Sequence, residues 1–254
     1  MSIRITILGS GSRGNAALVE AGPTRVLVDA GLSVRQIRLR AEAARGEPLD
    51  RVDAVVLTHG HGDHVGHART IAKAWDAPVY LTEATRRNPH LSALRGVRLF
   101  GSDTQFTIGE LCIDPHPIPH DAPQVALVFA REGARAALVT DLGEVQASLI
   151  DHLRDVPTLL IEANHDPALL AAGPYPAPLQ DRILSGVGHL SNAQTAAALG
   201  KLDWGLREVV LMHISETNNQ GALAQAAAEE ALAGHEATVR LAHQVEPLTV
   251  DVGA

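Results

Sequence analysis

Thr58-His59-Gly60-His61-Gly62-Asp63-His64 is the most informative stretch of this sequence, and it directly follows the apolar run Ala54–Leu57, which is typical of a buried strand. Three imidazoles and one carboxylate lie within six residues. Such a group would be electrostatically unfavourable if it were buried and protonated, whereas neutral imidazoles and carboxylates are good metal ligands. We expect Gly60 and Gly62 to let the backbone turn tightly, so that alternate side chains point at a common centre. The stretch predicts a metal site, with a solvated histidine-rich loop as the alternative.

The composition favours imidazole and carboxylate ligands over thiolates. The 254 residues include 13 histidines and one cysteine, Cys112, which excludes an internal disulfide and a cysteine-rich zinc site. The formal net charge of -8 argues against broad non-specific nucleic-acid binding, although bound metal ions can supply positive charge to an anionic substrate. The start of the chain lacks a signal-peptide h-region, and no apolar run approaches the ~20 residues that cross a bilayer. We therefore expect a cytoplasmic protein without a membrane partner.

Apolar periodicity and turn residues predict a mixed α/β chain that forms one domain, residues 1–254. The predicted strands are Arg4–Leu8, Ala16–Glu20, Arg25–Asp29, Ala54–Leu57, Val79–Leu81, Leu111–Ile113, Val125–Ala130, Ala136–Thr140, Leu159–Glu162 and Val209–Met212, with two more at the C-terminus. The predicted helices are Val34–Ala44, Ala68–Trp75, Val145–Leu153, Leu179–Leu184, Asn192–Lys201 and Gly221–Leu232. Because the strands come in clusters, two facing sheets with helices packed outside them are favoured over a doubly wound parallel sheet.

The H-x-H-x-D-H pattern after a strand resembles the signature of the metallo-β-lactamase fold, a four-layer αββα sandwich with its metals at one edge of the sheets. Asp29, His120-Asp121, Asp141 and His213 match further residues of that family in chain order, so the resemblance covers nearly the whole chain. Within the family the chain resembles the exonuclease-like YycJ (WalJ) group. Four segments carry this similarity: Gly9–Ala16, Glu162–Asp166, Gly188–Asn192 and His213–Asn219.

The resemblance implies a ligand set for two divalent metal ions. It assigns His59, His61 and His120 to one ion, Asp63, His64 and His213 to the other, and Asp141 as the bridge between them. Two ions ~3.5–4 Å apart can share a hydroxide and clamp both oxygens of a phosphodiester displacement. Zinc is the expected metal, with manganese or iron as alternatives, because mixed imidazole and carboxylate ligands accept all three.

Further residues are predicted around the metals with alternatives left open. Related nucleases that carry a β-CASP domain have a histidine upstream of the last ligand, proposed to protonate the leaving group. The resemblance therefore implies that His189 is catalytic, along with Asp63. A grip on the scissile phosphate and a packed structural role are the alternatives for His189. His116 competes with His120 as a ligand, and Asp141 could instead cap the turn that follows it.

Several polar residues are candidates for contacting substrate or orienting ligands, but for none does the sequence decide the role. Asp29 and Glu162 are carboxylates that could accept hydrogen bonds from ligating histidines. His165 could contact substrate or orient a ligand. Asn15 belongs to a glycine-rich loop that could bind an anion or form a plain turn. Arg86, Arg87 and Arg182 are candidate phosphate contacts, although charge runs usually form solvated faces.

The function that this pattern favours is metal-dependent hydrolysis of a phosphodiester by a metal-bridging hydroxide. A 5'-3' exonuclease-like enzyme acting on DNA or RNA ends is the leading hypothesis. The alternatives are a small-molecule hydrolase of a thioester, lactone or cyclic phosphodiester, and a non-catalytic metal-binding protein. The length leaves no room for an inserted nucleic-acid-clamping domain, so loops or a second subunit would have to hold the strand. The oligomeric state is left open.

Overall fold

The computed structural model describes residues 2–202 and 205–253, and these form two compact units. Unit 1 consists of residues 2–117, 122–135 and 243–253, and unit 2 of Ile118–Asp121 and Ala136–Ala242. The strands belong to two mixed seven-stranded sheets. The prediction that residues 1–254 make one domain is not tested by this division and stays a prediction.

The first sheet lies wholly in unit 1 and has the strand order β14-β1-β2-β3-β4-β5-β6. Its strands are β1 (Ile3–Gly9), β2 (Ala16–Ala21), β3 (Thr24–Val28), β4 (Ala54–Val56), β5 (Val79–Thr82), β6 (Val97–Phe100) and β14 (Leu248–Val252). Strands β3 to β6 are parallel, with Val28 opposite Val56. Because carboxyl ends of parallel strands meet at one edge, the residues that follow β3 and β4 lie side by side.

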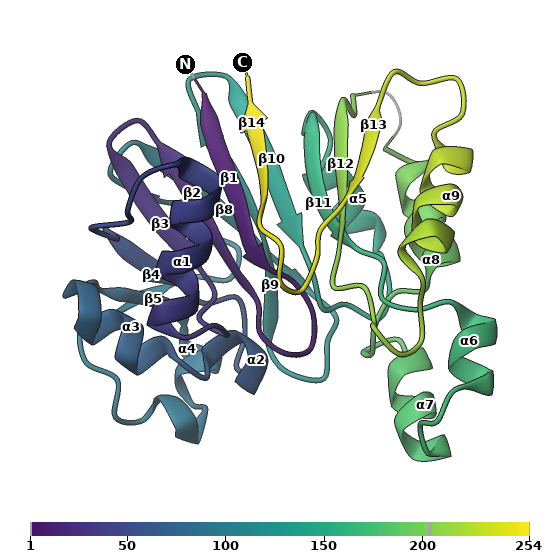
Figure 1. Cartoon of the computed structure of the whole chain (residues 1–254), viewed down its shortest axis with the longest axis horizontal. Helices are drawn as coiled ribbons and strands as arrows, with labels where there is room; N and C mark the ends of the chain where they lie inside the picture. The colour runs from purple at the N-terminus through teal and green to yellow at the C-terminus, as the bar shows by residue number, and fades with distance from the viewer. Residues whose placement is uncertain (1, 203–204, 254) are drawn as a thin grey trace. The chain divides into compact units, whose positions relative to one another are not determined.

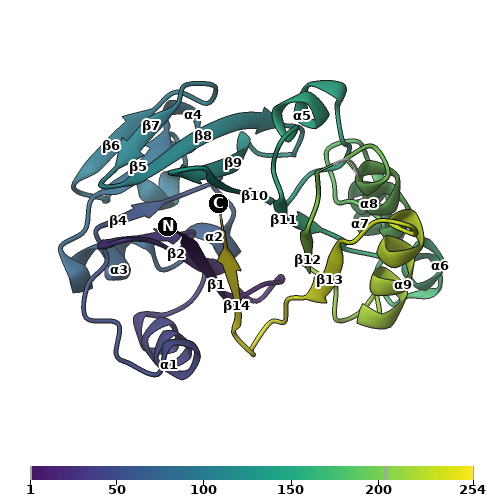
Figure 2. The same ribbon diagram turned by 90° about the horizontal axis from the view of Figure 1, so that it is seen from above.

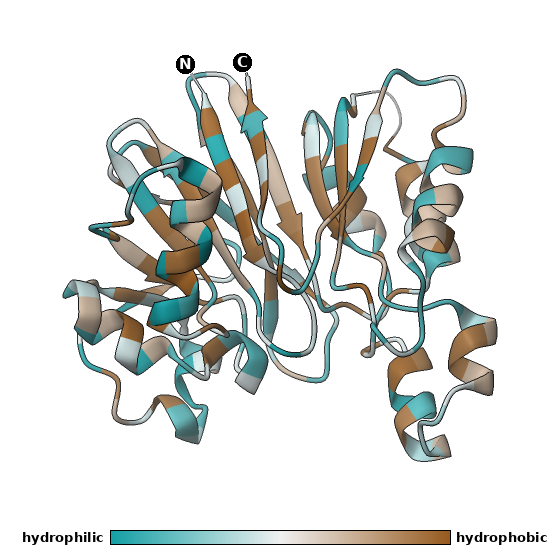
Figure 3. Cartoon of the chain, in the orientation of Figure 1, coloured by the Kyte–Doolittle hydropathy of each residue, from teal (hydrophilic) through white to brown (hydrophobic). Residues whose placement is uncertain are grey.

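Two helices of unit 1, α1 (Val34–Arg45) and α3 (Ala68–Trp75), cover one face of this sheet (Figures 1 and 2). Ile37 of α1 and Ile71 of α3 are fully buried in a core cluster with strand residues such as Leu27. Burial of a side chain of this size stabilises a fold by about 1.5–3 kcal/mol. On β1, apolar and polar residues alternate along the first part of the strand (Figure 3), as expected for a strand with one face turned to the core.

Unit 1 also contains three strands of the second sheet, in the order β9-β8-β7. They are β7 (Phe106–Ile108), β8 (Leu111–Ile118) and β9 (Gln124–Arg131). Phe106 stacks on Tyr80 and Phe100, with ring centroids 5.7 and 4.7 Å apart. Strand β8 continues past the predicted end at Ile113, so His116 lies within the strand.

In unit 2 the second sheet is parallel throughout, with the strand order β13-β12-β11-β10. The strands are β10 (Ala134–Val139), β11 (Thr158–Glu162), β12 (Glu208–Met212) and β13 (Thr238–Leu241). Helices α8 (Asn192–Leu199) and α9 (Gly221–Ala231) lie side by side against this part of the sheet (Figure 2). The parallel arrangement brings Asp141, Glu162 and His213 to one edge, because each stands at or just beyond the carboxyl end of its strand.

Most predicted elements are present, with bounds that differ by a few residues, and several short ones were missed. The unpredicted elements are α2 (Gly62–Val65), α4 (Glu83–Arg86), the 3-10 turn η1 (Pro89–Leu91), α6 (Pro167–Ala172), β6 and β7. The two remaining helices are α5 (Ala147–His152) and α7 (Ala177–Leu184). Short elements are set by tertiary packing rather than by periodicity, which explains why the pattern did not indicate them. Among the described residues, no helix has the length and apolar content to cross a bilayer.

Candidate metal centre

The histidine cluster of unit 1 lies at the end of β4. His59 and His64 are fully buried, whereas His61 and Asp63 are half-buried. The ring of His59 lies 4.6 Å from that of His61 and 4.2 Å from that of His64, measured between centroids. Residues 62–65 form helix α2, which carries Asp63 and His64 on one short turn. The structure thus brings the four residues of the motif together within unit 1.

Asp29 orients His64. Its carboxylate is buried just beyond β3 and accepts hydrogen bonds from the backbone N–H and the hydroxyl of Thr58 at 2.9 and 3.0 Å. The other oxygen, Oδ2, is also 3.0 Å from the hydroxyl of Thr58 and lies 2.7 Å from Nδ1 of His64. A buried carboxylate holds the proton on Nδ1, which leaves Nε2 of His64 as the ligand atom. The sequence offered Asp29 as such a partner without identifying the histidine.

Asn15, from the glycine-rich loop, lies beside the same ligand atoms. Its side-chain nitrogen is 2.9 Å from Nε2 of His64 and 3.3 Å from Oδ2 of Asp63, and its backbone N–H donates to the carbonyl of Asp63 at 2.8 Å. Asn15 also accepts a hydrogen bond from the N–H of Gly11 at 2.8 Å. The loop is therefore tied to α2, and its predicted role towards an anion stays a prediction.

The glycines near the cluster matter for close packing rather than for a special turn. Neither Gly60 nor Gly62 has a positive φ. The side chain of Asn88 donates to the carbonyl of Gly60 at 2.6 Å, and a Cβ at Gly60 would lie 2.6 Å from Asn88. A Cβ at Gly62 would meet nothing within 4 Å, whereas one at Gly31 would lie 1.7 Å from the carbonyl oxygen of Asp63. We expected Gly60 and Gly62 to allow a tight backbone turn, but neither needs the backbone freedom of glycine. Instead, the absence of a side chain lets neighbouring atoms approach closely at Gly60 and above all at Gly31.

Glu162 is the centre of the corresponding cluster in unit 2. Its side chain is fully buried at the end of β11. Oxygen Oε2 lies 2.8 Å from Nδ1 of His213 and 3.1 Å from Nδ1 of His189, and accepts from the N–H of Asp141 at 3.0 Å. Oxygen Oε1 accepts from the N–H of Leu190 at 2.8 Å. Glu162 therefore holds His213 by Nδ1 and leaves its Nε2 as the ligand atom, just as Asp29 does for His64.

Charge and burial shift the pKa values of this cluster. Burial by itself would raise the pKa of Glu162, but His189 and His213 outweigh it and lower that pKa to about 2. For His189, burial would lower the pKa, but the charge and hydrogen bond of Glu162 raise it above its ordinary value. In this arrangement Glu162 is an anion, and it favours a protonated His189.

Asp141 and His213 complete a compact donor set in unit 2. Oδ1 of Asp141 is 3.5 Å from Nδ1 of His213, and one donor atom from each of Asp141, Glu162, His189 and His213 lies within 4.8 Å of the others. Asp141, His213 and also Asp29 adopt left-handed backbone with φ of 58°, 51° and 62°. Such conformations are strained for residues other than glycine and cluster at functional sites.

His120 also belongs to unit 2 and has a buried side chain. Its Nδ1 lies 3.2 Å from the carbonyl oxygen of Gly188, and its ring centroid is 5.5 Å from that of His189. Its rival, His116, lies within β8 in unit 1. The placement of His120 beside His189 favours His120 as the ligand candidate.

The segments around Glu162, His189 and His213 are fastened to one another by asparagines. Asn164 donates to the carbonyl of His213 at 3.0 Å, and Asn192 and Asn219 exchange two hydrogen bonds at 2.9 and 2.8 Å. Asn219 also donates to the carbonyl of Ala163. The family resemblance singled out these segments, but it predicted no role for their asparagines. Neither Thr58 nor Asn88 was identified, because their partners are distant in sequence.

His165 is fully buried, and neither of its ring nitrogens has a hydrogen-bond partner in the described part of the chain. Burial lowers the pKa of His165, so its imidazole is neutral.

The candidate phosphate contacts are engaged elsewhere: Arg182 pairs with Asp121, Arg87 with Glu83, and Arg86 donates to the carbonyl of Leu91. None of these contacts assigns the three arginines to a substrate.

The residues present fit a metal centre. In each unit a buried carboxylate occupies Nδ1 of a histidine, which leaves Nε2 as the ligand atom, and another carboxylate stands beside that ring. This combination of oriented imidazole nitrogen and carboxylate oxygen is the donor chemistry of zinc and other divalent metals.

Comparison with known proteins gives consistent matches. A family model described as "Beta-lactamase superfamily domain" matches residues 24–214. The protein named exodeoxyribonuclease WalJ from Streptococcus pneumoniae serotype 2 is 32% identical over 228 residues, which are 86% of this chain and 84% of that protein. The exodeoxyribonuclease YycJ from Bacillus anthracis is 29% identical over 243 residues, covering 91% and 90% of the two chains.

Solved structures share the fold. The metallo-β-lactamase fold protein YhfI from Bacillus subtilis matches with a TM-score of 0.75 at 17% identity, covering 98% of this chain and all (100%) of that one. The zinc-bound PqqB from Methylobacterium extorquens matches with a TM-score of 0.72 at 19% identity, covering 98% and 99%. Together with the two mixed sheets and their flanking helices, these matches confirm the fold class that the sequence predicts.

Proposed function

Since this chain belongs to the metallo-β-lactamase superfamily, we propose that it is a metal-dependent phosphodiesterase that shortens nucleic acid from an end, in the manner of an exonuclease. The observation that carries the proposal is the similarity to two exodeoxyribonucleases across most of the chain. The paired buried carboxylates that orient His64 and His213 support the metal-dependent part of it.

The ligand assignment is part of the proposal and keeps the roles that the resemblance implies. The proposed ligands are His59, His61, Asp63, His64, His120, Asp141 and His213. Zinc is the proposed metal. Two bound divalent ions would supply Lewis acidity at the scissile phosphate and a water of lowered pKa.

Within unit 2 the protein's own residues suggest how the leaving group receives a proton. His189 holds Nδ1 against Glu162, so Nε2 is the ring nitrogen available to a substrate. Because Glu162 raises the pKa of His189, the imidazolium persists at higher pH than an ordinary histidine would allow. We therefore propose that Nε2 of His189 donates its proton to the leaving oxygen of the cleaved phosphodiester. Asp29 and Glu162 position the ligands, and Asn15 lies where it could contact substrate.

The decisive experiment incubates the metal-loaded protein with end-labelled single- and double-stranded DNA and RNA. Stepwise shortening that disappears in Asp63→Ala supports the proposal. Asp151→Ala is the matched control, because Asp151 is an exposed carboxylate on α5 that forms an ion pair with nearby Arg154. Inertness towards every phosphodiester, combined with rapid hydrolysis of a thioester or lactone, would replace the nuclease with the small-molecule hydrolase.

Two measurements test the finer assignments. Elemental analysis of protein purified without chelator or added metal identifies the ion and its stoichiometry. The turnover of His189→Ala is compared with that of the wild type at equal metal content. A loss that is smaller for substrates with an acidic leaving group supports proton donation, whereas unchanged turnover on all substrates rules it out.

A further inference from the structure

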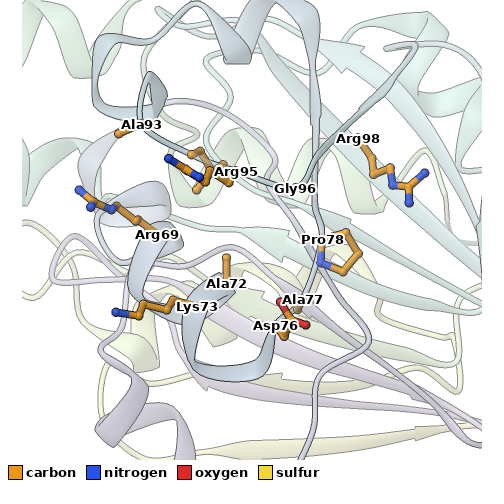
Figure 4. Close-up of a pocket in the computed structure, with 11 residues that line it drawn as sticks. Arg69, Ala72, Lys73, Asp76, Ala77, Pro78, Ala93, Arg95, Gly96 and Arg98 are labelled. Carbon is orange, nitrogen blue, oxygen red and sulfur yellow. The ribbon is translucent and has the colours of Figure 1, made fainter.

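Unit 1 contains a basic pocket outside the metal-ligand candidates. It has a volume of about 610 Å³ and lies between α3 and the segment that leads into β6 (Figure 4). Its charged lining residues are Arg69, Lys73, Arg95 and Arg98, with Asp76 as the one carboxylate among the residues that line it.

The four cations are not neutralised by the protein. All four residues are exposed, and none takes part in an ion pair in the part of the chain that the structure describes. They produce a concentrated positive patch on a chain whose formal net charge is -8. Like charges gathered in this way repel one another, and a bound polyanion relieves the repulsion. Such a patch attracts polyanions over a distance and releases counterions when they bind.

The arrangement of the cations suits a row of phosphates. Arg69 and Lys73 are four residues apart on α3, which places them on one face of the helix with a separation of ~6 Å along its axis. In Figure 4 the side chains of Arg69, Lys73 and Arg95 project to the same side of the pocket, whereas Arg98 projects to the other side. Repeated charges along one strand, rather than a single phosphate, match this spacing.

A smaller cavity lies next to the basic pocket and beside the proposed metal-binding segment. This cavity has a volume of about 320 Å³ and is lined by Gly62 of α2, His90 and other residues of unit 1. Arg69 and Leu94 line both cavities. The two cavities are therefore adjacent. Together, as the strand path, they extend from Gly62, the residue before Asp63, to the cluster of arginine and lysine side chains.

We propose that this path binds the sugar-phosphate backbone of a nucleic-acid strand at nucleotides other than those joined by the scissile bond. The inference rests on the proposed nuclease function and extends it: Arg69, Lys73 and Arg95 would hold the part of the strand that is not being cleaved. The path also gives this chain, whose formal net charge is negative, a local positive surface to which nucleic acid can bind.

The test uses the metal-loaded protein and a fluorescent single strand with phosphorothioate linkages that resist hydrolysis. Binding is measured by anisotropy over a series of salt concentrations for the wild type, Lys73→Ala/Arg95→Ala and Arg35→Ala. Arg35 is the matched control, because it is an exposed arginine on α1 of the same unit that lines neither cavity. Metal content and the thermal unfolding curve are compared first, and the single variants Lys73→Gln and Arg95→Gln replace the double variant if it does not fold.

The double variant is expected to bind more weakly and to lose about 1.4 from the slope of log affinity against log salt, since each phosphate contact on a single strand contributes about 0.7. Arg35→Ala is expected to keep the wild-type slope. For cleavable substrates, the rise in KM is expected to be larger for a long strand than for a dinucleotide, with kcat for the long strand retained. Equal slopes for all three proteins would overturn the inference.

The two proposals fail in different ways. If the wild type shortens DNA or RNA and the double variant behaves like it in slope and KM, the strand path is wrong and the nuclease assignment stands. If the wild type neither binds nor cleaves nucleic acid, the nuclease assignment falls and the strand path falls with it. Loss of binding to inorganic phosphate or to anionic vesicles in the double variant would then show that the pocket serves another anion.

Discussion

Replacing Glu162 with glutamine tests whether this one buried carboxylate holds His189, His213 and the backbone of Asp141 in place in unit 2. The change Glu162→Gln keeps the size of the side chain and removes its charge. If the amide oxygen takes the place of Oε2, the amide nitrogen faces the N–H of Leu190, so two donors meet. If the amide is turned round, His189, His213 and the N–H of Asp141 all lose their acceptor. Neither orientation satisfies every donor.

The expected cost follows from these contacts. Hydrogen bonds to a charged group contribute about 1.5–3 kcal/mol each, and leaving a buried donor without an acceptor costs about 1–3 kcal/mol. Breaking a buried charged network by changing one partner typically costs about 3–5 kcal/mol. We expect the free energy of unfolding of the metal-free protein to fall by about 3–5 kcal/mol. Affinity for zinc is expected to fall about 10–100-fold, because His213 loses the partner that holds its ring.

The pH dependence separates the charge of Glu162 from its shape. Because the pKa of Glu162 is lowered from 4.5 to about 2, its stabilising effect is complete above 4.5 and is lost as the pH falls towards 2. Because the pKa of His189 is raised above 6.5, its stabilising effect is complete below 6.5 and is lost as the pH rises through the folded-state value. The stability difference between wild type and variant is therefore expected to be largest between pH 4.5 and 6.5.

The assay is urea unfolding with chelator present, repeated across this pH range, followed by zinc competition with a chromophoric chelator. Glu208→Gln is the matched control, since Glu208 lies in the same sheet and forms a partly exposed ion pair with Arg240 at 2.9 Å. That pair is expected to contribute no more than about 1 kcal/mol. If Glu162→Gln is as stable as this control at every pH and binds zinc with wild-type affinity, the central role of Glu162 is refuted.

Three further predictions concern unit 1 and the metals. Gly31→Ala is expected to cost at least about 1–3 kcal/mol in urea unfolding, because its Cβ would overlap the carbonyl of Asp63, whereas Gly62→Ala should stay within about 0.5 kcal/mol; equal costs would contradict the packing argument. Asp29→Asn is expected to weaken zinc binding about 10–100-fold in the same competition assay, and an unchanged affinity would mean that Asp29 does not position His64. Zinc at about 1,000 times its dissociation constant should raise the free energy of unfolding by about 4.1 kcal/mol, and no rise on titration would exclude a site specific to the folded state.

The ligand candidates could be predicted from the sequence because much of their pattern is local. H-x-H-x-D-H places several donors on one turn, and the apolar run before it predicts the strand that presents them. The order of Asp29, His120, Asp141 and His213 along the chain added the fold class, which the structural matches confirm. The carboxylates Asp29 and Glu162 were also identified as candidates, but not their partners.

Tertiary structure decided which groups meet. Parallel pairing of β3 with β4 brings Asp29 to Thr58 and His64, and parallel pairing of β11 with β12 brings Glu162 to His213. Register between distant strands depends on the packing of whole sheets, so no short stretch of sequence encodes it. The overlap that makes Gly31 necessary and the gathering of Lys73 with Arg95 arise in the same way, from backbone segments that touch only after folding.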